Sequence, residues 1–347
     1  MSIRNRIAFV MVIAISSLIL LAILLTQFII IRNYEALEQA QVETDLQRAT
    51  NALNEFSSNL ARSARDYGVW SDTYAFVETG GPAYLDQFNA EVLSNLNAEF
   101  LIITNIDGEI VHSEAYSPGS LEPEPISPAI LDLFTGESSL LMQENSQEAI
   151  PYFISLPQGI LIAGVSPVLP SDGQGLANGS FVWARFLDDS VIQDLAEQTQ
   201  LDLRVNQINS GLPDDPGSIL PALETQNTVV QRQNAQIVSG YQLIRDAAGT
   251  PIAIISVESP RTLVRQGRIT AQVFLFSLIG GSVIILAILL LVIDRSVLRR
   301  VQHLSSDVRQ ISQSGDAALR VDIQGEDELA QLGRDINQTL HVLETTQ

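Results

Sequence analysis

The chain has 347 residues and a formal net charge of −21, and it contains neither cysteine nor lysine. Without these two residue types it has no disulfide, no zinc–thiolate site, no thiol nucleophile and no lysine for Schiff-base chemistry. Residues 32–269 carry 31 acidic side chains against 11 arginines. Such an acidic surface repels nucleic acid, so we exclude the class of DNA-binding proteins.

Two long apolar runs divide the chain. Ile7–Ile31 has 25 residues, and Val273–Ile293 has 21 residues and no charge. A bilayer core requires a helix of about 20 apolar residues, so both runs are predicted to span a membrane. The first is too long for the apolar part of a cleaved signal peptide, so we expect it to stay as an anchor. The predicted organisation is a cytoplasmic tail at 1–6, membrane helices at 7–31 and 270–293, an extracytoplasmic domain at 32–269 and a cytoplasmic module at 294–347.

Arginines beside the two runs indicate the orientation. The positive-inside rule assigns one group of them to the cytoplasm: Arg4, Arg6, Arg295, Arg299 and Arg300. Another group lies close to the runs on the opposite side: Arg32, Arg261, Arg265 and Arg268. Because long translocated loops largely escape the rule, the orientation stands. We expect a multi-pass protein of the inner (plasma) membrane whose middle domain lies in the periplasm or extracellular space.

Residues 33–65 contain neither proline nor glycine and predict one long helix. Apolar or small residues recur there in steps of four and three: Val42, Leu46, Ala49, Leu53, Phe56 and Leu60. The stripe has two interpretations, a coiled-coil seam between two chains or the inward face of an amphipathic helix packed on its own domain.

The rest of the middle domain predicts a mixed α+β fold with antiparallel hairpins. Helices are expected over 66–77, from Pro82 to Leu96 with Leu85, Phe88, Val92 and Leu96 inward, over 127–136 and over 188–198. The segment 212–221 is predicted to be a loop. Alternating apolar residues predict strands near 100–104, 109–113, 150–155, 159–167, 180–187, 201–205, 228–233, 236–245 and 251–258.

After the second run, two stretches keep the same four-three spacing on either side of a connector at 313–326. They hold Val301, Leu304, Val308 and Ile311, then Leu329, Leu332 and Ile336. Neither short helix can bury its stripe alone, so the pattern predicts a parallel four-helix bundle formed by two chains. A homodimer is therefore part of the fold prediction.

This cytoplasmic part resembles a HAMP relay domain. The resemblance rests on Gly315 in the connector, on Asp327-Glu328-Leu329 at the start of the second helix, and on Asn337 within it. It departs at Arg300, where many HAMP sequences carry proline. The resemblance implies that the bundle passes on a shift of the membrane helix, with Val301, Leu304, Val308, Ile311, Gly315, Asp327, Glu328, Leu329, Leu332 and Ile336 as relay residues.

The middle domain resembles a CHASE domain of the fourth type, a sensory domain of bacterial and archaeal kinases and cyclic-di-GMP enzymes. The motifs are Trp70-Ser71-Asp72-Thr73-Tyr74, Arg185-Phe186-Leu187-Asp188, and Leu195 with Gln198-Thr199 and Leu201. Together the two resemblances cover nearly the whole chain and imply a two-component or cyclic-di-GMP signalling receptor.

Candidate ligand residues are aromatic and charged. Trp70, Asp72 and Tyr74 fit a cationic or amphipathic ligand, and Arg185, on one strand face with Trp183, fits an anionic group. The plainer interpretation is that the aromatic residues pack the helix on the sheet and that Arg185 neutralises acidic neighbours. His112 has no second histidine nearby in the sequence, so no metal site and no cofactor are predicted.

These patterns predict a homodimeric transmembrane receptor that detects a small molecule or a periplasmic protein and relays the signal to a cytoplasmic output. The chain holds no catalytic set of its own. An alternative is the input half of a sensor histidine kinase or diguanylate cyclase whose catalytic domain lies outside this chain. A further alternative is a ligand-free membrane scaffold.

Overall fold

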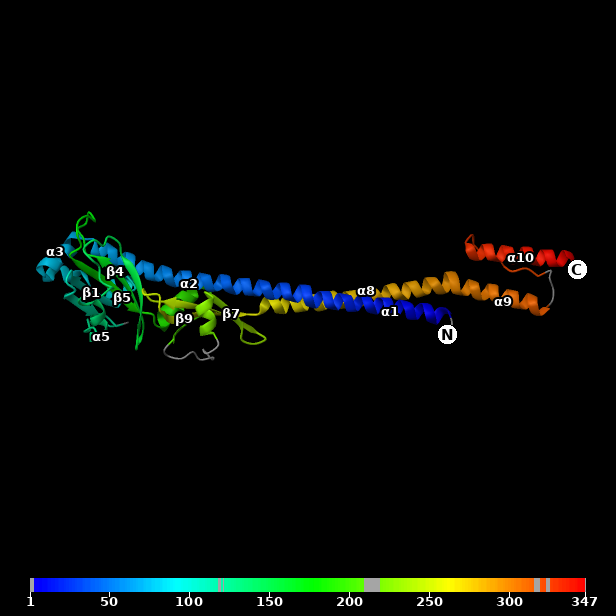
Figure 1. Ribbon diagram of the computed structural model, residues 1–347, viewed down its shortest axis with the longest axis horizontal. Helices are drawn as coiled ribbons and strands as arrows, with labels where there is room; N and C mark the ends of the chain where they lie inside the picture. Colours follow the sequence, from blue (N-terminus) through cyan, green and yellow to red (C-terminus); the bar gives the residue numbers. More distant parts are fainter. Residues whose placement is uncertain are drawn as a thin grey trace. The chain divides into compact units, whose positions relative to one another are not determined.

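The computed structural model describes residues 3–117, 120, 122–208, 219–314, 319–322 and 325–346. Its internal contacts divide the chain into two compact units. We call Ala36–Thr262 the strand unit, and Met1–Glu35 with Leu263–Gln347 the helical unit. The elements of both are labelled in Figure 1.

The strand unit contains two antiparallel sheets. The first has five strands in the order β2-β1-β5-β4-β3, and the second has four in the order β6-β9-β8-β7. The strands are β1 Phe100–Asn105, β2 Ile110–Ala115, β3 Ile150–Leu156, β4 Gly159–Pro167, β5 Gly179–Phe186, β6 Asp202–Gln207, β7 Thr228–Arg232, β8 Ile237–Arg245 and β9 Pro251–Pro260. Every predicted strand is confirmed to within two residues at each end.

Helix α2, Arg32–Gly68, packs on both sheets of the strand unit. Its predicted stripe is buried within a single chain, with Val42, Leu46, Leu53 and Leu60 no more than 2% exposed. The amphipathic-helix interpretation is therefore confirmed. A coiled-coil seam through these residues is wrong, because their side chains already fill the core of their own domain.

Two glycines let α2 approach the sheets closely. A Cβ atom on Gly164 of β4 would lie 2.5 Å from the backbone nitrogen of Ala61, and one on Gly240 of β8 would lie 2.8 Å from Cγ1 of Val42. Real Cβ atoms essentially never come this close. The backbone of α2 therefore contacts the first sheet directly at Gly164, and the side chain of Val42 contacts the backbone of the second sheet at Gly240.

The chain turns sharply between α2 and α3, Ser71–Thr79. The single helix predicted over 66–77 is wrong here. α2 ends at Gly68, Val69 forms a parallel bridge with Leu169 next to the sheet, and Trp70 is extended. The cause is tertiary, since the bridge to Leu169 takes the backbone out of helical geometry.

A second predicted helix is also divided. Residues 82–96 form a 3₁₀ helix, Pro82–Gln87, and a separate α4, Ala90–Asn95. The side chain of Asn89 accepts a hydrogen bond of 3.0 Å from the Val92 N–H and so starts the new helix. This changes the register, and Leu93 rather than Val92 is fully buried.

The remaining helices of the strand unit are short. They are α5 Pro128–Leu131, continued by the 3₁₀ turn Asp132–Phe134, α6 Asp189–Thr199 and α7 Leu220–Thr225. The predicted helices over 127–136 and 188–198 are thus confirmed. Most of the loop predicted over 212–221 lies outside the described residues.

A buried ion pair joins the two ends of the strand unit. Nε of Arg261 donates to Oε2 of Glu38 at 2.8 Å, and these side chains are only 3% and 8% exposed. Glu38 lies near the start of α2, and Arg261 follows β9 immediately before the next helix. The pair therefore fixes the point where the chain enters this unit to the point where it leaves.

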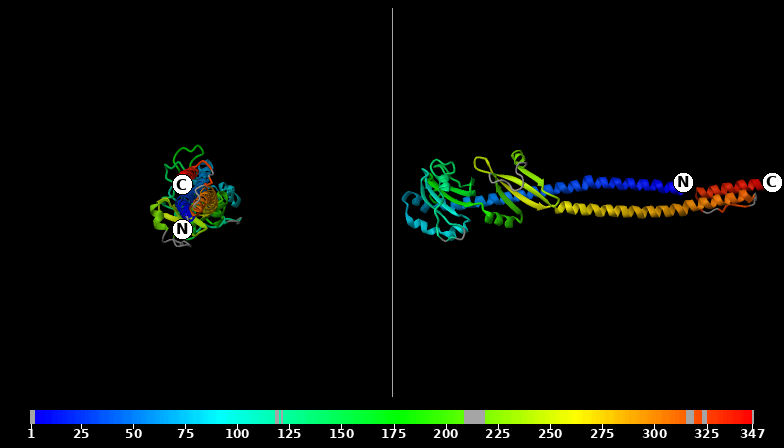
Figure 2. Two further views of the ribbon diagram at one scale, coloured as in Figure 1. Left: turned by 90° about the vertical axis from the view of Figure 1, so that its right-hand side faces the viewer. Right: turned by 90° about the horizontal axis from the view of Figure 1, so that it is seen from below.

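The helical unit contains the apolar helices, α1 Ile3–Leu25 and α8 Thr262–Ile293, which lie side by side (Figure 1, Figure 2). π-helical turns at Thr26–Ile31 and Asp294–Leu298 continue them without a break into α2 and α9, Arg299–Ser314; α10 is Glu328–Thr346. Among the described residues, one helix, Thr262–Ser314, is long and apolar enough to cross a membrane. The apolar helix Phe9–Leu25 is shorter, so the first span stays a prediction.

Replacing Gly164 by alanine is expected to lower the free energy of unfolding by about 3 kcal/mol, the upper end of the usual cost of overpacking. The added Cβ would meet the backbone of α2 rather than a movable side chain. Thermal denaturation of the full chain in detergent, followed by tryptophan fluorescence, measures the change. Gly81→Ala is the control, because its nearest new neighbour is Thr79 Oγ1 at 3.9 Å. Equal melting of the two variants would contradict the close approach of α2.

Candidate functional site

Two of the predicted aromatic ligand residues, Trp70 and Trp183, belong to a packed aromatic cluster. Trp183 is fully buried in β5, and its ring lies edge-on to Phe181, with centroids 5.1 Å apart, and to Tyr67, with centroids 5.7 Å apart. Trp70 contacts the other side of this cluster, 6.4 Å from Tyr67 and 6.3 Å from Tyr84. Tyr67 thus brings Trp70 and Trp183 into one group, in which they pack α2 and α3 against the first sheet.

The polar members of the prediction lie elsewhere. Asp72 is exposed in the first turn of α3, and Tyr74 is half-buried with its carbonyl accepting a hydrogen bond of 3.0 Å from Asn178. Arg185, two residues after Trp183, faces a different set of neighbours at the end of β5. The ligand role of Trp70, Asp72, Tyr74, Trp183 and Arg185 stays a prediction.

Arg185 is the centre of a polar cluster. Its Nη2 donates to Ser190 Oγ at 3.0 Å and lies 4.0 Å from Asp188 Oδ1, while its Nε lies 3.6 Å from Glu99 Oε1. No hydrogen bond satisfies this buried Nε within the part of the chain that the structure describes. The guanidinium is therefore held by two carboxylates, the Ser190 hydroxyl and the side-chain oxygen of Asn97, to which Nη1 donates at 3.5 Å, while its Nε–H has no hydrogen-bond acceptor among the described residues.

The two carboxylates have opposite pKa shifts. Burial raises the pKa of Glu99, and the hydrogen bond that it accepts from the Phe186 N–H and the charge of Arg185 offset only part of this effect. Burial also acts to raise the pKa of Asp188, but hydrogen bonds from Val191 N–H and the Ser190 hydroxyl, together with Arg185, outweigh it and lower the pKa. The charged form of Asp188, which caps α6, is thus stabilised, whereas burial disfavours the charged form of Glu99.

Two cavities meet at Glu99. The larger cavity has a volume of about 510 Å³, and its lining includes Phe100, Phe186, Glu124 and Asp188. The smaller cavity, of about 160 Å³, is lined in part by Arg185. Both cavities also contact Glu99, Tyr116 and Ser117. A lining of aromatic rings and carboxylates suits a small ligand with a positive charge and an apolar part. Sequence reasoning missed Glu99 and Tyr116, because neither belongs to a spaced motif.

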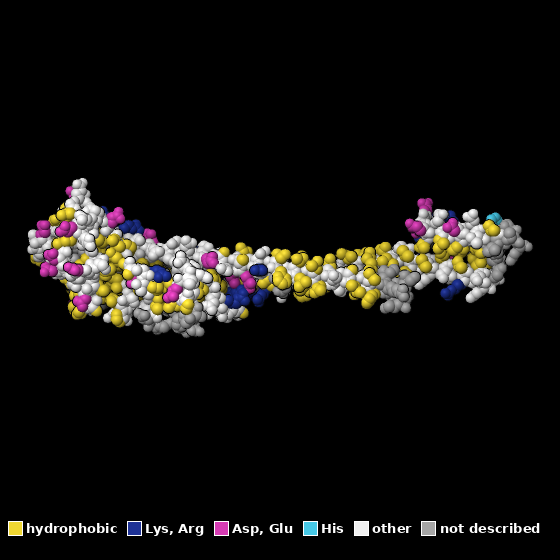
Figure 3. Space-filling view, in the orientation of Figure 1, with side chains coloured by type: hydrophobic (Ala, Val, Ile, Leu, Met, Phe, Trp, Pro, Cys, Tyr) yellow, Lys and Arg dark blue, Asp and Glu magenta, His cyan; other side chains and the backbone are white. Residues whose placement is uncertain are grey.

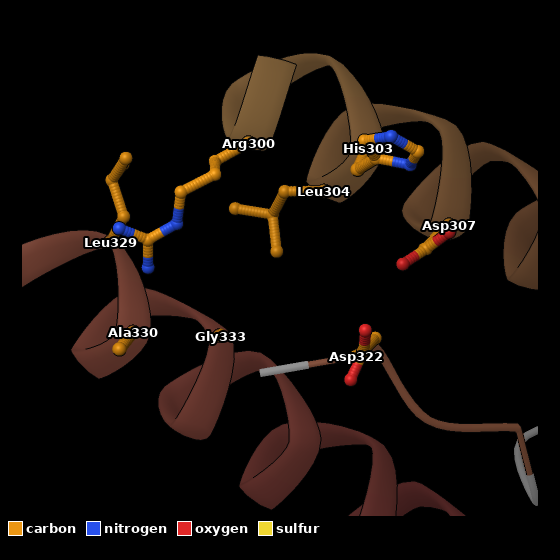
Figure 4. Close-up of a pocket in the computed structure, with 8 residues that line it drawn as sticks. All are labelled: Arg300, His303, Leu304, Asp307, Asp322, Leu329, Ala330 and Gly333. Carbon is orange, nitrogen blue, oxygen red and sulfur yellow. The ribbon is translucent and has the colours of Figure 1, made fainter. Parts of the chain in front are cut away.

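In the helical unit, a groove of about 320 Å³ lies between α9 and α10 (Figure 4). Asp307 from α9 and Asp322 from the connector approach each other across it, and Arg300 points toward the start of α10. Nη1 and Nη2 of Arg300 both donate hydrogen bonds to the carboxylate of Asp327, and Nη2 lies 3.1 Å from Oδ1. These bonds lower the pKa of Asp327, which also accepts from the Ala330 N–H at 3.1 Å. Arg300 thus secures the residue that caps α10.

Asn337 holds the connector. Its side-chain oxygen accepts from the Val321 N–H at 2.8 Å, and its nitrogen donates to the Val321 carbonyl at 3.0 Å. Val321 is only 3% exposed. This paired contact gives a physical role to the asparagine that the sequence motif singled out.

The predicted relay residues form a stripe that one chain only partly covers. Val308 is 39% exposed and Leu332 48% exposed, while five others are half-buried: Val301, Leu304, Ile311, Leu329 and Ile336. Asp327 and Glu328 are exposed at the start of α10, and Gly315 lies outside the described residues. Within a single chain, the apolar sides of α9 and α10 therefore remain partly open to solvent.

Comparison with known proteins identifies the two modules. Residues 52–206 match the model of the CHASE4 domain, and residues 295–345 match the model of the HAMP domain. The chain carries a CHASE4 domain followed by a HAMP domain. With a helix able to cross a membrane between them, this arrangement is that of a transmembrane sensor that relays a signal.

A curated histidine kinase aligns with most of the chain. The chain is 27% identical over 322 residues to the methanogenesis regulatory histidine kinase FilI of Methanothrix harundinacea, an alignment that covers 89% of this chain and 34% of FilI. The chain thus spans about a third of the length of that relative. Neither of the two matched domains is a catalytic domain.

Similar solved structures include two sensory domains. A domain of a sensory box/GGDEF family protein from Vibrio parahaemolyticus gives a TM-score of 0.43 at 10% identity, covering 68% of this chain and 99% of that one. The sensor domain of the histidine kinase DctB from Vibrio cholerae gives 0.36 at 12% identity, covering 66% and 98%. These TM-scores are too low to establish a common fold, so the assignment rests on the sequence matches.

Substituting Glu99 by glutamine is expected to change how stability depends on pH. Because burial raises the folded-state pKa above the ordinary value of 4.5, the folded chain holds more protons than the unfolded chain in the window between those two pKa values. The native protein should therefore lose stability as the pH rises from 4.5 through the raised pKa, relative to Glu99→Gln. Chemical denaturation of both proteins across this range measures the difference. Parallel stability curves would contradict the raised pKa.

Proposed function

We propose that this chain is the input half of a homodimeric sensor histidine kinase, with the CHASE4 domain outside the cell membrane and the HAMP domain inside it. One observation carries the proposal. A single unbroken helix, Thr262–Ser314, starts directly after the last strand of the sensory domain, passes through the apolar segment and ends within the HAMP domain. A displacement at its outer end therefore reaches the HAMP domain without an intervening loop.

The energy required for such a relay is small. A ligand needs only a few kcal/mol of differential affinity to shift a two-state equilibrium substantially. The cavities beside Glu99 and Arg185 supply a place for it, and the buried Glu38–Arg261 pair lies directly before the helix that has to move. We assign the signal to a small organic cation with an apolar part, because carboxylates and aromatic rings line the larger cavity.

Dimerisation follows from the exposed stripe of the HAMP helices. Leaving Val308 and Leu332 in water forgoes the burial of two aliphatic side chains, each of which contributes about 1.5–3 kcal/mol when fully covered. A second copy that adds its own α9 and α10 in parallel covers both stripes. The first apolar helix, α1, then anchors each chain as a second span.

A histidine kinase is favoured as the output over a diguanylate cyclase. The curated relative that aligns over 322 residues is a histidine kinase. The kinase domain would receive the signal from α10, either in the same polypeptide or in a partner protein. A ligand-free scaffold has no comparable support, since it gives the cavities and the unbroken helix no role.

Cross-linking tests the dimer. Because the chain has no native cysteine, Leu304→Cys is the only thiol in its variant. In membranes, Leu304→Cys is expected to form an intermolecular disulfide much faster than Ser305→Cys, whose side chain lies on the exposed face of α9. Equal rates at these neighbouring positions would be incompatible with a parallel bundle through Leu304.

An insertion tests the relay. The catalytic half of FilI is fused after residue 347, and autophosphorylation is measured in membrane vesicles. One alanine inserted between Ser296 and Val297 turns α9 by about 100° and should change the rate, whereas seven inserted residues make about two turns and should restore it. A one-residue insertion at Gly175, which is exposed and has no neighbour within 4 Å of an added Cβ atom, is the control. If none of the insertions alters the rate, the helix does not couple the two domains.

A further inference from the structure

A groove lies between the two apolar helices of the helical unit. It has a volume of about 380 Å³, and its wall on α8 runs from Arg268 through Gln272 to Leu275. Its wall on the first helix runs from Ile31 back to Ile23. Seven residues of helix separate Arg268 from Leu275, a distance of about 10 Å along the axis. The groove therefore has a charged end and an apolar end, and it lies along the direction in which the helices enter the membrane.

Its charged end is closed by a close helix contact. The ring of Tyr34 lies against the backbone of Gly267, where an added Cβ would be 2.5 Å from Tyr34 Cδ2. The π-helical turn Thr26–Ile31 forms the wall directly below this contact. π-helical turns of this kind are rare and frequently occur at functional sites. The helices thus touch above the groove and leave space between them at the level of its apolar lining.

Three exposed arginines lie around the charged end of the groove. Arg32, Arg265 and Arg268 are exposed, and within the described part of the chain none of their side chains makes a hydrogen bond or an ion pair. Arg261, by contrast, is buried against Glu38. Figure 3 shows basic side chains, with acidic ones among them, beside one end of the apolar surface. These three exposed guanidinium groups form a local positive charge, in a chain of net charge −21, that is available to an anion from outside the protein.

We propose that this groove binds an anionic phospholipid of the outer leaflet. The phosphodiester lies between Arg268 and Gln272, Arg265 and Arg32 add attraction for the headgroup, and one acyl chain follows Ala271, Leu275 and Ile23. Guanidinium groups bind phosphate oxygens through two parallel hydrogen bonds, which suits a chain that uses arginine and no lysine. The lipid also accounts for the arginines that stand against the positive-inside rule, because their partner is the membrane surface itself.

Lipid retention tests the proposal on the full chain. The purified protein in detergent is incubated with an equimolar mixture of phosphatidylglycerol and phosphatidylcholine, and bound lipid is measured by native mass spectrometry. We expect preferential retention of phosphatidylglycerol, lowered about fivefold by Arg268→Gln and further by adding Arg265→Gln. Arg62→Gln, which removes an exposed arginine paired with Glu55 on α2, is the matched control and should retain the lipid normally.

Two results would overturn the proposal. One is equal retention of the two lipids, or retention of phosphatidylglycerol that Arg268→Gln leaves unchanged. The other is complete disulfide formation by Gln272→Cys in vesicles both with and without phosphatidylglycerol, because a second copy of the chain then covers the groove. Unchanged melting of Arg268→Gln verifies that the variant is folded. Lipid binding requires α1 and α8 to lie in a membrane, but it does not require that α8 relays a signal. If the insertions after Ser296 leave the kinase rate unchanged, the relay fails and the lipid result still stands.

Discussion

The direct contact of α2 with both sheets is the constraint on which the rest of the strand unit depends. Gly164 on one sheet and Gly240 on the other remove the side chains that would hold the helix away. Leu46, Ala49, Leu53 and Leu60 then fill the space between helix and strands. Because protein interiors are densely packed, neither sheet can slide along this helix without opening voids. The two sheets are therefore tied to one rod, and α2 continues from the first apolar helix.

The polar cluster around Arg185 contrasts with this rigid packing. Its members come from separate elements, with Glu99 before β1, Arg185 at the end of β5 and Asp188 at the start of α6. A buried ion pair is held together by its hydrogen bonds as much as by charge, and here one N–H of Arg185 is left unsatisfied. A ligand that accepts this N–H or neutralises Glu99 would change the balance of the cluster. That sensitivity is what a detector requires.

The sequence predicted the parts whose signal is local. Alternating residues marked the strands, run length marked the membrane helix, and four-three spacing marked α9 and α10. The missed features depend on contacts between distant segments. The break at Val69 exists because Leu169 bridges to it, and Glu99 comes near Arg185 only through the register that places Phe100 opposite Ala184. Likewise, the stripe on α2 could not show whether its partner was another chain or its own sheets.

The Glu38–Arg261 pair has an architectural consequence. It holds the first and last turns of the strand unit within hydrogen-bonding distance of each other. A folded module whose ends are neighbours can be inserted between two antiparallel helices without stretching either of them. The sensory domain can therefore be exchanged between receptors as one unit. Such an exchange requires only that the helices on either side of it keep their rotation about the helix axis at the two junctions.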